Sequence, residues 1–187
     1  MSPVDEVTVA EAVRIGAKLY ATNPEVVAPD AYVGMFHGWI QGQGLDGLPI
    51  DVADYKHVPD GPGIMLIGHE ADRAIDFGEG RPGVLYQRKR DLGGTLEERF
   101  TAVLAAVEET AALIEGDPAA AGVRFGRDEV LVRILDRATA PNDDATLEAV
   151  APALTAAVAT VWPGRAAALA RVTEDPRGPF TARVALS

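Results

Sequence analysis

The side chains best suited to chemistry in this 187-residue chain are its three histidines, which lie close together as His37, His57 and His69. Imidazole titrates near neutral pH, so a histidine can act as a general acid or base or can ligate a metal. Tryptophan is equally scarce, yet Trp39 lies two residues from His37. The rest of the chain is rich in alanine, valine, leucine and charged residues, which is typical of a scaffold.

Carboxylates accompany two of the histidines. Asp51 and Asp54 precede His57, and Glu70 and Asp72 follow His69. Divalent metals accept imidazole together with carboxylate ligands. One interpretation is a divalent metal held by His57, His69 and Asp51. A catalytic version makes His57 or His69 the general base, oriented by Asp54 or Asp51. The competing interpretation is that His69 is a hydrogen-bonded core residue and His57 a loop residue.

Two further segments are candidates for ligand binding. His37, Trp39 and Gln41 would line a pocket, with the rings available for stacking. Their spacing also fits a helix that anchors the core through Phe36, Trp39 and Ile40. Arg88 would bind an anionic ligand, or it belongs to a solvated strand whose charges discourage edge pairing.

Composition excludes several function classes. The chain has no cysteine, so thiolate chemistry and disulfides are absent. Its two serines, Ser2 and Ser187, are terminal, which argues against a serine hydrolase. A net charge of −11 argues against nucleic-acid partners. No apolar run approaches about 18 residues and the first residues are acidic, so we expect a cytoplasmic protein without a membrane partner.

Capping signals and apolar periodicity predict four helices. A capping box at Thr8–Glu11 opens the first, which is expected to reach about Tyr20, and a second is expected over 30–41. A second capping box at Thr95–Glu98 opens a helix to about Glu115. The last follows 141–144 and ends near Pro163.

Alternating apolar residues and turn signals predict the strands. They are expected at 48–55, 63–71, 84–90, 129–137, 167–173 and 180–186. Several are joined by hairpins, so we expect an α+β two-layer sandwich with a mixed or antiparallel sheet of about five to six strands and helices mainly on one face. A single domain is expected over 1–187, with a helical part at 1–41 and the sheet and two long helices at 48–187.

The segments Phe36–Gln41, Ile50–Val58, Gly61–Glu70 and Asp136–Asn142 together resemble a group of uncharacterised bacterial proteins. The resemblance covers most of the chain and implies a bacterial protein of similar length. That group has no assigned activity, so no functional residue is transferred from it.

Two hypotheses on function follow. The first is a protein, enzymatic or not, that binds a small molecule or a metal near His37, His57 and His69. The second is a non-catalytic homo-oligomeric or regulatory partner-binding module, in which Ile64–Ile67 and the terminal hairpin form an interface.

Overall fold

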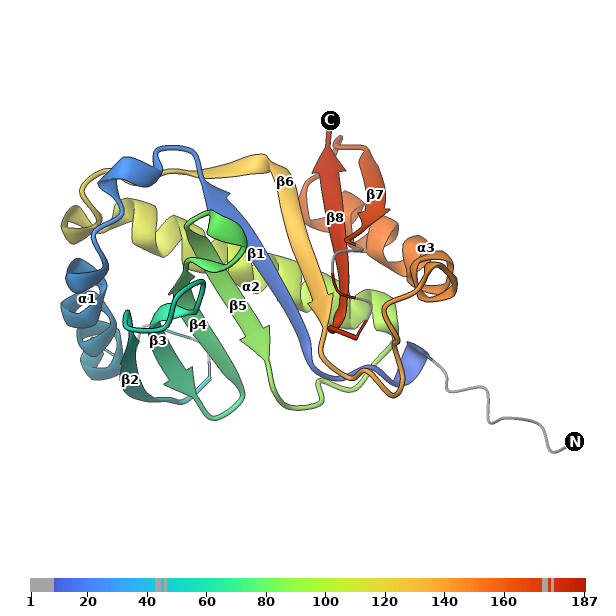
Figure 1. Ribbon diagram of the computed structural model, residues 1–187, viewed down its shortest axis with the longest axis horizontal. Helices are drawn as coiled ribbons and strands as arrows, with labels where there is room; N and C mark the ends of the chain where they lie inside the picture. The colour runs from blue at the N-terminus through green and yellow to red at the C-terminus, as the bar shows by residue number, and fades with distance from the viewer. Residues whose placement is uncertain (1–8, 43–44, 46, 173–174, 176) are drawn as a thin grey trace, which may run out of the picture.

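The computed structural model describes residues 9–42, 45, 47–172, 175 and 177–187 and shows an α+β fold (Figure 1). The strands are β1 (Ile15–Ala21), β2 (Pro49–Tyr55), β3 (Gly63–Gly68), β4 (Ala71–Asp76), β5 (Gly83–Arg88), β6 (Phe125–Ile134), β7 (Ala167–Arg171) and β8 (Phe180–Leu186). The helices are α1 (Pro29–Gly42), α2 (Leu96–Gly116) and α3 (Asp144–Val161). Short 3₁₀ turns lie at Val9–Glu11, Pro24–Val26, Gly78–Gly80 and Pro118–Ala120; the third is η3.

All eight strands form one open sheet in the order β2-β3-β4-β5-β1-β6-β8-β7, and every neighbouring pair is antiparallel. The expectation of five to six strands was therefore too low. One extra strand, β4, follows β3 directly after a turn at His69 and Glu70. The other is β1, which lies inside the segment predicted to be the first helix.

The predicted helix from Thr8 to Tyr20 is wrong in the described part of that segment. Only the turn Val9–Glu11 is helical, and β1 runs through the middle of the sheet. Residues 15–20 are all buried; Ile15, Ala17 and Leu19 belong to the hydrophobic core, and the residues between them face the other side of the sheet, as in a strand. Tertiary pairing with β5 and β6 overrides the local helix signal.

One face of the sheet carries the core. Buried residues at alternate positions of the central strands pack against the apolar sides of the helices. They include Val84 and Tyr86 on β5, Val130, Val132 and Ile134 on β6, and Phe180, Ala182 and Val184 on β8. The strands predicted at 84–90, 129–137 and 180–186 are thus found in the structure, as β5, β6 and β8. In Figure 1, α2 passes behind the strands and lies alongside α3.

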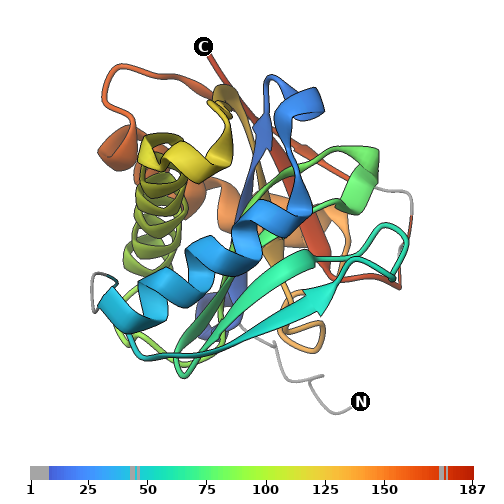
Figure 2. The same ribbon diagram turned by 90° about the vertical axis from the view of Figure 1, so that its left-hand side faces the viewer.

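The opposite face of the sheet is not covered by a long helix in the part of the chain that the structure describes. Figure 2 shows α2 on one side of the sheet, with η3 and the β2–β3 turn on the other. The side chains on this open face come from the residues that lie between the core-facing ones along each strand. Examples are Lys18 and Tyr20 on β1 and Leu131 on β6. Lys18 is nevertheless only 1% exposed.

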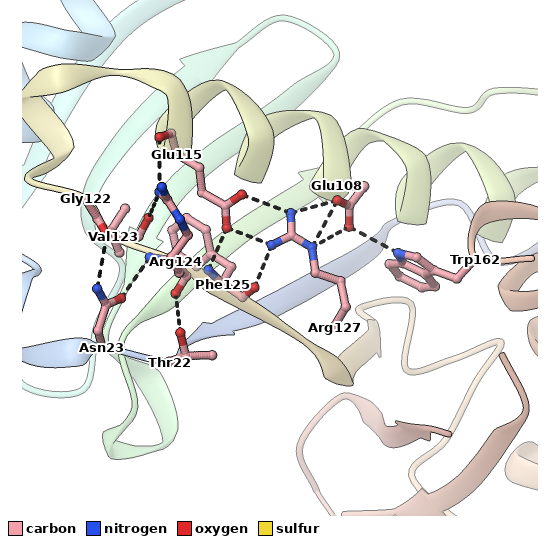
Figure 3. Close-up of polar contacts among 10 residues, drawn as sticks. All are labelled: Thr22, Asn23, Glu108, Glu115, Gly122, Val123, Arg124, Phe125, Arg127 and Trp162. Carbon is pink, nitrogen blue, oxygen red and sulfur yellow. Dashed lines mark hydrogen bonds and ion pairs between the residues drawn. The ribbon is translucent and has the colours of Figure 1, made fainter.

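Charged side chains fasten α2 to β6. Arg127 of β6 forms ion pairs with Glu108 and Glu115 of α2, and Glu108 also accepts the indole N–H of Trp162 (Figure 3). Burial favours neutral Arg127, but the two carboxylates outweigh it and raise the Arg127 pKa. The predicted capping box of α2 is confirmed between Thr95 and Glu98. This network is structural, because every charge in it is paired with another member.

Helix α3 is long and apolar enough to cross a membrane by length and composition alone. In this fold it packs on α2 and β7, and Val150, Leu154 and Val158 are completely buried. These residues form the buried side of the helix, and most of the other apolar residues of α3, chiefly alanines, are exposed or partly exposed.

Candidate functional site

The open face of the sheet is hollowed into a trough of about 840 Å³. Its floor comes from β1, β6 and β8. One wall is formed by the β2–β3 turn and η3, which Figure 1 shows in front of the strands. The other wall comes from the segments after β6 and before β8. Its polar lining residues are Tyr20, Asp60, Asp76, Glu79, Arg81, Arg133, Asn142, Asp175, Thr181 and Arg183.

Lys18 lies beneath this trough and joins β1 to η3. Its ammonium group donates to the Asp76 carboxylate at 2.5 Å, to the Gly78 carbonyl at 2.8 Å and to the Glu79 carboxylate at 3.0 Å. All three N–H donors of the amine are engaged. Lys18 is therefore a structural and electrostatic element of the site and is not poised to attack a substrate.

Glu79 connects this buried lysine to the exposed surface of the trough. It forms a second ion pair with Arg133 of β6. Burial alone would raise the pKa of Glu79, but the charges of Arg133 and Lys18 outweigh burial and hold that pKa below its ordinary value. The carboxylate is thus held ionised at neutral pH between two cations.

Tyr20 supplies a hydroxyl group that has no hydrogen-bond partner among the described residues, although the residue is only 4% exposed. The Arg81 guanidinium covers its ring at 3.7 Å, and the Lys18 ammonium lies 5.1 Å from the ring centre. Burial and the nearby Glu79 charge raise the pKa of Tyr20 to about 12. Tyr20 is therefore a neutral hydrogen-bond donor at the floor of the trough.

A second group of charges surrounds Glu129 of β6. Its carboxylate lies 2.8 Å from Arg81 and 3.6 Å from Arg183. Both arginine side chains are about half exposed, at 52% and 50%. One carboxylate therefore pairs with two guanidinium groups. Both arginines keep N–H groups that can donate further hydrogen bonds.

Backbone strain and unpaired polar atoms also gather at the trough. Among the described residues three non-glycine residues have positive φ, and Asp60 at 53° and Glu79 at 61° both line the trough. The Oδ1 atom of Asn142, at the far wall, is also buried without a partner in the described part of the chain. Strained residues and unsatisfied polar atoms are typical of functional sites.

The structure does not bring His57 and His69 together. Tyr55 pairs with Gly63 at one end of the β2–β3 hairpin, and Pro49 pairs with Gly68 at the other. His57 follows the first end and His69 the second, so the length of β3, roughly 17 Å, separates them. Both are exposed, so His69 is not a core residue either.

The proposed metal set of His57, His69 and Asp51 is therefore not assembled. The described residues contain no group of three or more histidine and carboxylate side chains able to hold a metal. Asp54 is exposed and binds Lys56, whose backbone N–H and ammonium group lower the Asp54 pKa. It does not contact a histidine through a hydrogen bond in the described part of the chain, so the acid–base pair with His57 is not formed either.

The remaining candidates lie away from the trough. His37 and Gln41 are exposed on α1, and the His37 ring contacts the Val33 carbonyl at 2.8 Å. Phe36 is buried, and Trp39 packs on it with ring centres 5.1 Å apart, as expected of a helix that anchors the core. Arg88 lines a different cavity on the helix-covered face.

Lys18, Tyr20, Asp76, Glu79 and Arg81 were not identified from the sequence. The usable signal was the alternation of Ile15, Ala17 and Leu19, because it leaves Lys18 and Tyr20 together on the other face of a strand.

Replacing Glu79 with glutamine is expected to lower stability at neutral pH and to have less effect in acid. The folded-state pKa of Glu79 is depressed, so its ionised form stabilises the fold above its ordinary pKa of 4.5. This contribution is lost as the pH falls through the folded-state value. Urea unfolding of both proteins between pH 7 and pH 3 measures the difference. A difference that stays constant over this range would contradict the ion-pair assignment.

Comparison with known proteins gives no family for this chain: no protein-family model matches it, and no curated protein matches it significantly.

Proposed function

We propose that this protein binds a small polar anion in the trough on the open face of its sheet. The observation that carries the proposal is the buried hydroxyl of Tyr20, which has no partner among the described residues, in a trough lined by three arginines. Arg81, Arg133 and Arg183 each form an ion pair through one nitrogen with a described carboxylate. Guanidinium groups and a neutral hydroxyl are the donors that carboxylate and phosphate groups accept.

The charges around the trough also define the ligand. Four cations, Lys18, Arg81, Arg133 and Arg183, lie at the trough with five carboxylates, Asp60, Asp76, Glu79, Glu129 and Asp175, so an anion is held by hydrogen bonds from the arginines and not by an overall positive charge. Asp60 and Asp175 lie at the walls, where they can accept hydrogen bonds. The ligand class is therefore a carboxylate or phosphate that also carries hydroxyl or amino groups.

Binding accounts for the site better than catalysis does. The lysine is fully hydrogen-bonded, and the tyrosine is held neutral by its raised pKa. Neither is suited to act as a nucleophile or base at neutral pH. The half-exposed Arg81 lies over the Tyr20 ring, so a ligand that binds Arg81 lies next to this tyrosine.

Titration calorimetry with malate, aspartate and glucose 6-phosphate tests this proposal, and succinate tests the need for a hydroxyl or amino group. Arg183→Gln is expected to weaken binding at least tenfold, since it removes a charge-assisted hydrogen bond. Tyr20→Phe is also expected to weaken binding, while the free protein becomes more stable because a buried unpaired hydroxyl is removed. If malate and aspartate bind and glucose 6-phosphate does not, the acid group of the ligand is a carboxylate. The reverse result identifies a phosphate.

The matched control is Arg90→Gln, which changes an exposed arginine beyond β5 and outside the trough. It should leave the affinity unchanged. The proposal fails if none of these anions binds, if spermidine binds as tightly as they do, or if Arg183→Gln and Tyr20→Phe bind like the unmodified protein.

A further inference from the structure

A second cavity of about 640 Å³ lies on the other face of the sheet, between α2 and the strands β2 to β5. It shares no lining residue with the trough. Small side chains on α2 leave it open to solvent along the helix: Ala102 and Ala105 are exposed and Ala106 is partly buried, where larger residues would fill the space. Leu66 and Tyr86 of the sheet form apolar parts of its wall.

Two arginines form a charged end of this cavity, whose lining is polar in part and apolar in part. Arg73 of β4 is 6% exposed; its Nε donates to Thr110 at 3.2 Å, and its guanidinium lies 5.2 Å from the Tyr86 ring centre. The Arg88 side chain is 11% exposed and donates to the Glu70 carboxylate at 3.2 Å and to the Arg90 carbonyl at 3.0 Å. Its Nη2 group has no partner among the described residues.

The Glu70 carboxylate lies where the acid group of a ligand would bind Arg88. Its side chain is 47% exposed, and it reaches the well-buried Arg88 from the turn between β3 and β4. An exposed carboxylate gains little from such a pair, because water and salt screen it. A ligand carboxylate that is held in the cavity by its apolar part can therefore displace Glu70 into solvent.

The charge balance favours a single negative charge on the ligand. Arg73 and Arg88 are balanced by Glu70 and Glu109, which also lines the cavity. Moving Glu70 into solvent leaves an excess of one positive charge. At the mouth, Leu48 is 65% exposed and provides an apolar surface that the body of a ligand can cover.

We infer that this cavity binds a monocarboxylate with an apolar body, such as a medium-chain fatty acid, with the acid group on Arg88. The alanines of α2 and the Leu66 and Tyr86 side chains contact the apolar part. This site is independent of the trough, which takes polar anions and holds no comparable apolar wall of alanines.

Titration calorimetry with octanoate tests the inference, with octanol, acetate and inorganic phosphate as comparison probes. Octanoate should bind at least tenfold more tightly than octanol, which lacks the charge, and than acetate or phosphate, which lack the apolar body. Arg88→Gln should weaken octanoate binding at least tenfold. Glu70→Gln should strengthen it, because the competing carboxylate is removed; a purely structural Arg88–Glu70 pair would not produce this gain.

Ala105→Leu should abolish octanoate binding by filling the cavity. Ala112→Leu is its matched control, because Ala112 is exposed on the same helix and does not line the cavity. Arg177→Gln, at a side chain 93% exposed, is the control for charge. Arg183→Gln should leave octanoate binding intact, which separates this test from that of the trough.

The inference is overturned if octanoate does not bind, if phosphate or octanol binds as tightly, or if Glu70→Gln weakens binding. It is also overturned if Ala105→Leu and Ala112→Leu have equal effects on octanoate affinity.

Discussion

Replacing Lys18 with methionine is expected to lower the free energy of unfolding by about 3–5 kcal/mol. Lys18 is 1% exposed, and Asp76 beside it is 5% exposed. Without the lysine, the Asp76 carboxylate keeps a hydrogen bond from the Gly78 amide but loses its counter-charge in a buried position. Urea unfolding at pH 7 measures the change.

Lys89→Met provides the control for this experiment. Lys89 also pairs with an aspartate, Asp72 at 2.6 Å, but its side chain is 35% exposed. The loss there should stay within about 1 kcal/mol. Combining Lys18→Met with Asp76→Asn should recover part of the lost stability, because the unpaired charge is removed. If Lys18→Met and Lys89→Met lower the free energy of unfolding equally, burial does not make the Lys18–Asp76 ion pair more important for stability than the Lys89–Asp72 pair.

The consequence for function follows from the position of Lys18. It fixes Glu79, and Glu79 in turn holds Arg133 at the trough. The charged groups at the centre of the trough are therefore mutually positioned before a ligand arrives. Such preorganisation lowers the entropy lost on binding.

Most of the helices and hairpins could be predicted from local signals. The helix at Leu96–Gly116 has a capping box and a clear apolar period, and Phe180–Leu186 has apolar residues at every second position, all of them buried. The failure at Ile15–Ala21 has a physical cause. Thr8 and Glu11 suggest a capping box, whereas pairing on both sides with β5 and β6 decides the outcome. That pairing is between residues far apart in sequence, and the local alternation of Ile15, Ala17 and Leu19 is too short to outweigh the helix signal in a sequence-based prediction.

The trough was beyond sequence reasoning for the same reason. Its floor joins β1, β6 and β8, which become neighbours only through the strand order of the sheet. The histidines, in contrast, were conspicuous by rarity, and the antiparallel pairing of β2 with β3 placed two of them at opposite ends of one hairpin. Closeness in sequence across a turn did not imply closeness in space.

Deleting residues 174–187 is expected to prevent folding. The terminal hairpin was predicted to be structural, and β8 lies between β6 and β7 within the sheet. The deletion removes Phe180, Ala182 and Val184, all completely buried, and leaves β7 without a partner strand. It also exposes the hydrogen-bonding edge of β6, a surface prone to aggregation. Soluble yield, far-ultraviolet circular dichroism and the melting midpoint measure the outcome.

A graded substitution keeps this prediction testable if the truncated chain is lost to aggregation. Phe180→Ala is expected to lower the free energy of unfolding by about 3–5 kcal/mol, because it leaves a cavity where β8 meets the core. Arg177→Gln, in the turn before β8, is 93% exposed and should change stability by no more than about 0.5 kcal/mol. A truncated protein that stays soluble with an unchanged melting midpoint would contradict the placement of β8 inside the sheet. A Phe180→Ala protein as stable as Arg177→Gln would do the same, since a phenylalanine without exposed surface cannot be removed from a packed core without loss of stability.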